Sequence, residues 1–115
     1  MALNNTRKFV RATLNLLVNY ENVNDFCTDY TRDISGGGLF IRTNRPLAIG
    51  TKLRIHFMLP EVDELIYTDG IVVRNTLNEE SPEEEGMGIE FTEIMPRYRL
   101  IIEKMVQDNS NESSS

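Results

Sequence analysis

The sequence predicts an all-β fold, a small antiparallel barrel, followed by one C-terminal α-helix. Several short segments alternate apolar and polar residues, as half-buried strands do, and turn-forming residues separate these segments at regular intervals. The hydrophobic period changes to that of a helix only near the C-terminus. A chain of 115 residues suits one domain with a modest core.

The N-terminal half of the chain predicts three strands. In the first, over residues 12–20, every second residue is apolar. The second spans 25–31 and is broken by a stretch with three successive glycines, after which the third spans 38–43. Glycines cost conformational entropy, so these three indicate a backbone that takes a positive φ or comes close to another strand or to a ligand.

Residues 52–59 alternate again and predict a fourth strand, whereas the next apolar segment has two interpretations. Asp69 and Gly70, inside the segment 65–75, form either a hairpin turn between two very short strands or a bulge in one long, curved strand. The bulge is favoured because residues 59–64 already provide a turn.

The C-terminal part of the chain predicts the last strand and a single helix. The strand spans 87–91 after an acidic loop at 78–86, and a helix of about three turns follows, with Pro96 in its first turn. Its apolar residues recur at helical spacing: Ile94, Tyr98, Ile101, Ile102 and Met105. The chain is expected to divide into a flexible basic arm at 1–11, the barrel with its helix at 12–107 and a disordered polar tail at 108–115.

The charge of the chain and its cysteine content restrict the partners and the location. The net charge of −6 argues against a nucleic acid polymer or an anionic membrane, because both bind basic surfaces. Arg7, Lys8 and Arg11 nevertheless make the arm basic, which suggests a compact anionic ligand that is held locally. Cys27 is the only cysteine, so no intramolecular disulfide can form and the cytoplasm is the expected location. No segment approaches the length of a membrane span.

The sequence contains no catalytic or metal-binding constellation. A nucleophile elbow would need glycine in place of Asp33, and a dinucleotide-binding loop would need glycine in place of Ile41. His56 is the only histidine and is expected on the surface of a strand, and one cysteine cannot build a Cys/His metal site. The sequence therefore predicts no enzyme, no metal site and no cofactor.

The side chains that could bind the phosphate and the base of a guanine nucleotide lie in two places, before the first strand and before the glycines. Arg7 and Arg11 offer planar guanidinium groups that pair with phosphate or with the O6/N7 edge of guanine, although an isolated arginine pair more often belongs to a solvated terminus. The Asp33 carboxylate can accept hydrogen bonds from guanine N1–H and N2–H₂, and the Ser35 hydroxyl can reach a base or a phosphate. Alternatively, both residues only stabilise a turn.

Taken together, these residues form a pattern that resembles the PilZ domains, bacterial receptors for cyclic di-GMP. The pattern R-x-x-x-R is Arg7–Arg11, and D-x-S-x-x-G follows about twenty residues later as Asp33–Gly38. The resemblance covers nearly the whole chain, because GTKLRIHFMLP, DGIVVRN, GMGIEF and the closing helix follow in the family's order. It implies a six-stranded antiparallel β-barrel closed by a C-terminal α-helix.

The resemblance also implies a site for cyclic di-GMP. Its basic residues are assigned to phosphates and guanine edges, and the others to the guanine and the turn beneath it: Arg7, Lys8, Arg11, Asp33, Ser35 and Gly38. Arg74 is only a weak candidate. The expected function is that of a single-domain cytoplasmic receptor that signals to an unidentified downstream protein through ordering of its arm. The alternative is a PilZ-fold interaction module that binds no nucleotide.

Overall fold

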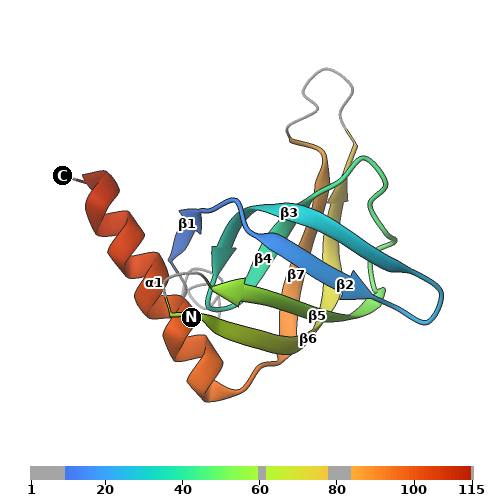
Figure 1. The fold of residues 1–115 in the computed structure, drawn as a ribbon. Helices are drawn as coiled ribbons and strands as arrows, with labels where there is room; N and C mark the ends of the chain where they lie inside the picture. Colours follow the sequence, from blue (N-terminus) through green and yellow to red (C-terminus); the bar gives the residue numbers. More distant parts are fainter. Residues whose placement is uncertain (1–9, 60–61, 78–83, 115) are drawn as a thin grey trace, which may run out of the picture.

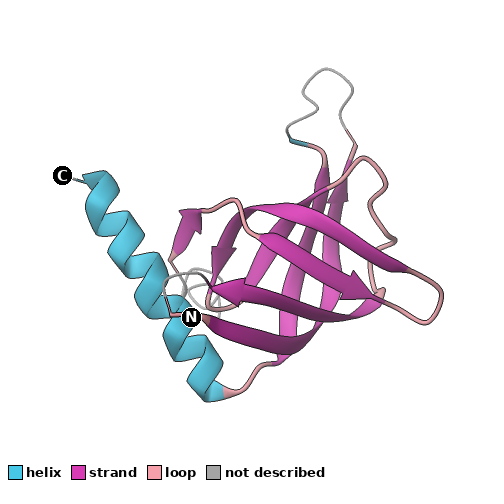
Figure 2. Cartoon of the chain, in the orientation of Figure 1, coloured by secondary structure: helices cyan, strands magenta, loops and turns pink. Residues whose placement is uncertain are grey.

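The computed structural model describes residues 10–59, 62–77 and 84–114, which form seven strands and one helix (Figure 1, Figure 2). In chain order these are β1 (Arg11–Thr13), β2 (Leu17–Glu21), β3 (Phe26–Ser35), β4 (Gly38–Arg42), β5 (Lys52–Leu59), β6 (Glu64–Thr76), β7 (Gly86–Glu93) and α1 (Pro96–Ser114). No helix in this described part of the chain is both long and apolar enough to span a membrane.

Six of the strands close into an antiparallel barrel, which confirms the predicted fold class. The order around the barrel is β2-β5-β6-β7-β4-β3, and β3 pairs back to β2. β1 is an additional short strand beside β3. The core contains inward side chains from every strand of the barrel: Val18, Ile34, Ile41, Phe57, Ile66 and Ile89. In Figure 1, α1 lies across one end of the barrel, next to β1.

The first predicted strand is divided into β1 and β2, which lie along the same edge of β3. The predicted alternation persists, but the pairing with β3 is irregular at residues 14–16, where Leu14 N donates to Arg32 O and Thr31 N donates to Leu16 O. The hydroxyl of Thr31 adds two further hydrogen bonds there. It accepts a hydrogen bond from Leu16 N at 2.9 Å and donates one to Leu14 O at 2.6 Å. Arg11, which the sequence places at the end of the arm, is instead the first residue of β1 and is paired with Ser35.

The glycine-rich stretch forms a tighter turn than predicted. The sequence predicts that this strand ends at residue 31, but β3 continues to Ser35, so that only Gly36 and Gly37 connect it to β4. The strand continues because β1 pairs along its last three residues on one side while β4 pairs on the other. Asp33 is therefore a strand residue and not part of a turn.

β6 is one long strand, and the predicted bulge is confirmed. Its register against β7 shifts between Asp69 and Gly70, and again between Val72 and Arg74. A Cβ at Gly70 would lie 2.6 Å from the Cγ2 atom of Ile89, so the bulge permits a close approach of the two strands.

The helix is longer than predicted. We expect about three turns and a disordered tail at 108–115, yet α1 continues to Ser114. Propagation of an existing helix adds one hydrogen bond for each residue fixed, so polar residues can extend it. Ile102, Met105 and Val106 are buried and pack α1 on β1 and β3.

Candidate ligand-binding site

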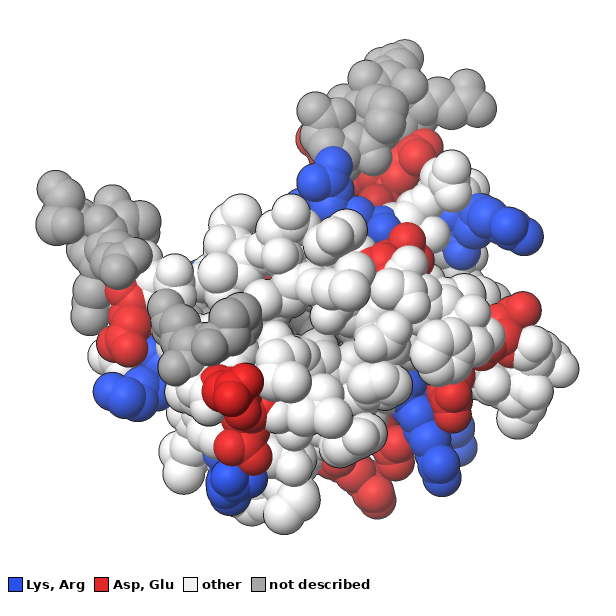
Figure 3. All heavy atoms as spheres, in the orientation of Figure 1, with Lys and Arg blue, Asp and Glu red and all other residues white. Residues whose placement is uncertain are grey.

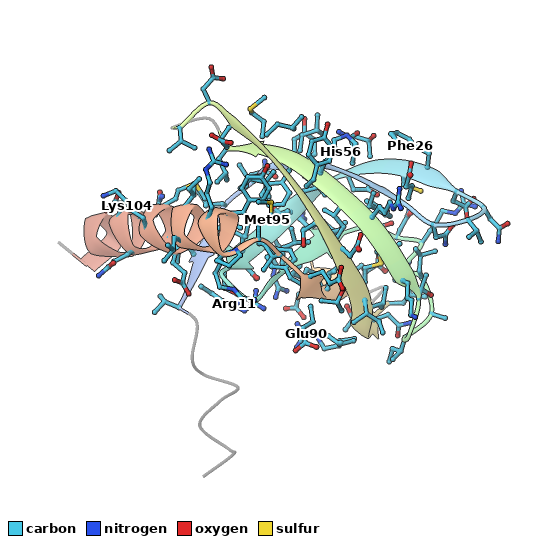
Figure 4. All side chains as sticks on the ribbon, turned by 90° about the horizontal axis from the view of Figure 1, so that it is seen from below. Arg11, Phe26, His56, Glu90, Met95 and Lys104 are labelled. Atoms are coloured by element: carbon cyan, nitrogen blue, oxygen red, sulfur yellow. The ribbon has the colours of Figure 1, made fainter. Side chains whose placement is uncertain are left out.

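A surface pocket of about 790 Å³ lies where β1, β3, β4, β6, β7 and α1 meet. Its charged lining residues are Arg11, Arg32, Asp33, Arg74, Glu90 and Arg99. Figure 4 shows Arg11 and Glu90 on the same side of the barrel. Four arginines against two acids make this pocket a local centre of positive charge on a chain whose net charge is −6. Such a pocket favours an anionic ligand.

Two guanidinium groups hold the carboxylate of Asp33. Arg11 Nη1 forms an ion pair with Oδ1, and Arg32 Nε lies 3.0 Å from Oδ2. The Asp33 side chain is 14% exposed and that of Arg11 is 52% exposed, so the carboxylate lies deeper in the pocket. An ionised carboxylate has about four lone-pair positions, so two ion pairs leave acceptor capacity for the N–H groups of a ligand.

A bulge in β3 places Arg32 in this pocket. The register of β3 against β4 shifts between Thr31 and Asp33, so Arg32 has no partner residue in the β3–β4 ladder. Thr31 and Ile34 are buried, and the two residues between them both line the pocket. A regular strand would have directed these two neighbours to opposite faces.

The ring of Phe40 forms a platform beneath two of the arginines. Phe40 is 2% exposed, yet it is not part of the barrel core and lies on the outer side of β4. The Cζ atom of Arg32 lies 4.0 Å from the ring centroid, and that of Arg74 lies 5.4 Å from it. Both distances are within the range of cation–π interactions, so the ring helps to hold two guanidinium groups in the pocket.

Ser35 and Gly38 shape the turn next to the pocket. Ser35 is buried, and its Oγ accepts a hydrogen bond from Gly37 N at 3.1 Å and donates one to Gly38 O at 3.4 Å. A Cβ at Gly38 would lie 2.0 Å from the carbonyl oxygen of Ile89 on β7. The close approach that requires glycine at Gly38 is therefore to another strand, and Gly38 is not a lining residue of the pocket.

Of the six predicted site residues, the structure brings Arg11, Asp33 and Ser35 together at one pocket. Arg7 and Lys8 lie outside the described residues. Sequence reasoning misses Arg32, Phe40 and Arg99 and ranks Arg74 low. For Phe40 the sequence holds a signal, because it is the middle one of three consecutive apolar residues, 39–41, in a strand whose strict alternation would expose it.

A second polar contact lies outside this pocket. The hydroxyl of Tyr20, which is buried, donates a hydrogen bond to Asp29 Oδ2 at 2.6 Å. Burial and the neighbouring Asp29 carboxylate raise the pKa of Tyr20 far above its ordinary value.

Within residues 10–59, 62–77 and 84–114, no group of three or more His, Cys, Asp or Glu side chains is arranged to hold a metal ion.

Several solved structures have a similar fold. The Bacillus subtilis inhibitor of motility (MotI/DgrA) matches with a TM-score of 0.81 at 23% identity, over 92% of this chain and 52% of that protein, so this chain spans about half of its length. The PilZ domain of YcgR from Escherichia coli, solved with cyclic di-GMP, has a TM-score of 0.67 at 14% identity, and the alignment covers 93% of each chain.

The PilZ domain of CeSA from a cellulose-synthesizing bacterium matches with a TM-score of 0.63 at 18% identity, over 85% of this chain and 95% of that one. A comparison with curated protein sequences finds no match. The sequence model of the PilZ domain matches residues 5–108, which is most of the chain. This chain therefore belongs to the PilZ domain family.

Proposed function

We propose that this PilZ domain is a receptor for cyclic di-GMP. The observation that carries the proposal is the pocket, in which Arg11, Asp33 and Ser35 meet three further arginines on an otherwise acidic chain. Cyclic di-GMP presents two phosphates and two guanines to such a site. The YcgR domain with a similar fold was solved with this ligand, which supports the proposal.

The chemistry of the lining residues suits both parts of the ligand. The guanidinium of Arg11 can pair bidentately with a phosphate or with the O6/N7 edge of guanine. The Asp33 carboxylate accepts hydrogen bonds from guanine N1–H and N2–H₂, and Arg74 on its aromatic platform presents a flat cation to a phosphate or a base. Arg7 and Lys8 complete the phosphate contacts in this proposal, and Gly38 sets the turn.

We further propose that the bound ligand signals through the segment that precedes β1. Arg11 both lines the pocket and begins β1, so a ligand held between Arg11 and the turn at Gly36 would draw residues 1–10 against the barrel. This creates a new surface for a downstream protein. In hydrogen exchange, ligand should slow exchange at residues 4–12 but not in β5, and an arm that is equally protected without ligand contradicts this step.

The alternative function is an interaction module that binds proteins without nucleotide. It is favoured by the largely uncharged face over β2 and β3 in Figure 3, where Leu17, Phe26 and Tyr30 are exposed. In either case the protein acts by binding and carries out no reaction, requires no cofactor, and works in the cytoplasm.

Isothermal titration with cyclic di-GMP distinguishes the two functions. We expect a dissociation constant on the order of 1 μM or tighter, with GMP and cyclic AMP binding much more weakly. The stoichiometry reports whether one ligand or a stacked pair occupies the site. No heat, and no displacement of a labelled ligand, at concentrations on the order of 100 μM would contradict the receptor function.

A further inference from the structure

Helix α1 reaches the pocket through a single side chain among the described residues, that of Arg99. The helix packs on β1 and β3, the strands that carry Arg11 and Asp33 (Figure 1). Arg99 is half-buried, and its Nε donates a hydrogen bond to the carbonyl oxygen of Gly36 at 3.1 Å. This contact joins the helix to the turn that follows the two predicted site residues of β3.

The turn itself is held between α1 and β7. One helical turn after Arg99, the side chain of Glu103 covers Gly36 so closely that a Cβ there would lie 2.7 Å from the Glu103 Cγ atom. On the other side, the N–H of Phe91 donates to the carbonyl oxygen of Gly37 at 2.9 Å. A change in the position of the Arg99 guanidinium is therefore transmitted to both the turn and the helix.

We infer that Arg99 is a ligand-contacting residue and that α1 consequently responds to occupancy of the pocket. The inference rests on the proposed function, because it needs an anionic nucleotide in the pocket. The hydrogen bond to Gly36 holds the guanidinium at the pocket wall, where it can pair with a phosphate of the ligand. A charged hydrogen bond of this kind, when lost, weakens binding by about ten- to a hundredfold.

Arg97 offers a matched control on the same helix. Its Nη2 lies 2.9 Å from Glu64 Oε2 on β6, and its Cζ lies 5.5 Å from the ring centroid of Tyr98. Arg97 is not a lining residue of the pocket. The two arginines have the same charge and the same helix propensity. Arg99→Gln removes a cation from the pocket wall, whereas Arg97→Gln removes one from the ion pair with Glu64.

The test titrates cyclic di-GMP into the full chain, wild type and both variants. Arg99→Gln should weaken binding by about tenfold or more, and Arg97→Gln should change it by less than about twofold. Hydrogen exchange provides a readout that a purely structural role would not move. Saturating ligand should slow exchange at residues 96–107 in the wild type and in Arg97→Gln but not in Arg99→Gln.

The results of these two measurements distinguish failure of the inference from failure of the proposed function. Wild-type affinity and wild-type protection of α1 in Arg99→Gln overturn the inference while the receptor function stands. If the wild type itself binds no cyclic di-GMP, the proposed function fails. If Arg99→Gln no longer unfolds cooperatively, Arg99→Lys replaces it. Lysine lacks the planar fork that can serve Gly36 and a phosphate together, so binding should weaken by roughly threefold or more, and wild-type binding by this variant also overturns the inference.

Discussion

Arg32 and Asp33 are consecutive residues of β3, yet their side chains form an ion pair with 3.0 Å between Arg32 Nε and Asp33 Oδ2. Neighbours in a regular strand point to opposite faces and cannot meet in this way. The register shift after Thr31 removes this restriction and gives the pocket both a cation and a carboxylate from one strand. The bulge is therefore as much a part of the site as the side chains it directs.

Arg11→Ala should weaken cyclic di-GMP binding by about ten- to a hundredfold and leave the barrel folded. A bidentate guanidinium contact is worth roughly 1–3 kcal/mol, whereas an ion pair with a largely exposed partner contributes at most about 1 kcal/mol to stability. Titration calorimetry measures the first effect and thermal unfolding the second. Arg45→Ala, at an exposed arginine outside the pocket, is the control. Arg7→Ala is expected to weaken binding in the same way.

Unchanged binding by Arg11→Ala would show that this side chain serves Asp33 alone. Loss of cooperative unfolding would show instead that the ion pair holds β1 to β3. Asp33→Ala is a less direct test, since it frees both Arg11 and Arg32 from their shared partner at once.

Phe40→Leu should reduce both stability and ligand affinity. The ring is almost fully buried, so its replacement costs on the order of 1–3 kcal/mol of unfolding free energy, and Arg32 and Arg74 lose their platform. Phe57→Leu removes the same ring from the barrel core and should cost similar stability while leaving affinity unchanged. Urea unfolding and calorimetry separate the two effects. Equal affinities for the two variants would rule out the platform role.

Periodicity predicts the parts of this fold that follow one rule along the chain. The alternation of Ala12, Leu16, Val18 and Tyr20 predicts the buried face of β1, of β2 and of the segment between them, and Asp69-Gly70 predicts the bulge in β6. The irregular pairing between β1 and β2 involves Thr31, which lies 15 and 17 residues from its partners Leu16 and Leu14, so it leaves no local signal. The extension of β3 likewise depends on pairing with β1 and β4.

The two sequence motifs predict only those pocket residues that belong to the motifs themselves. Arg11, Asp33 and Ser35 follow from the family resemblance, but Arg32 depends on a bulge and Arg99 on the packing of α1, far away in the sequence. That the glycine turn forms the floor of a ligand site stays a prediction. What the sequence does not reveal is that Gly38 itself comes close to the backbone of Ile89 on β7.

Gly38→Ala should destabilise the barrel strongly. The new methyl group would lie 2.0 Å from the carbonyl oxygen of Ile89, so β4 and β7 must separate, and we expect a loss of more than about 2 kcal/mol of unfolding free energy. Gly36→Ala is the matched control, because there the nearest atoms belong to the flexible side chain of Glu103, which can move. Urea unfolding of both variants measures the difference. Similar stabilities would contradict the close packing of these strands.

The stability of the protein should decrease at alkaline pH, and Tyr20 should account for part of the decrease. The pKa of Tyr20 is raised in the folded protein by burial and by Asp29, whereas the unfolded chain releases this proton near pH 10. The contribution of the Tyr20 proton to stability is therefore fully present below about pH 10 and is lost as the pH rises further, at up to roughly 1.4 kcal/mol per pH unit.

Tyr20→Phe should lower stability at neutral pH by about 1 kcal/mol, since Asp29 loses a hydrogen bond, but should flatten the alkaline decrease. Tyr67→Phe, at an exposed tyrosine, should keep the wild-type slope. Urea unfolding between about pH 8 and 11 gives these slopes, and a Tyr20→Phe curve parallel to that of the wild type would show that the Tyr20 proton does not stabilise the fold.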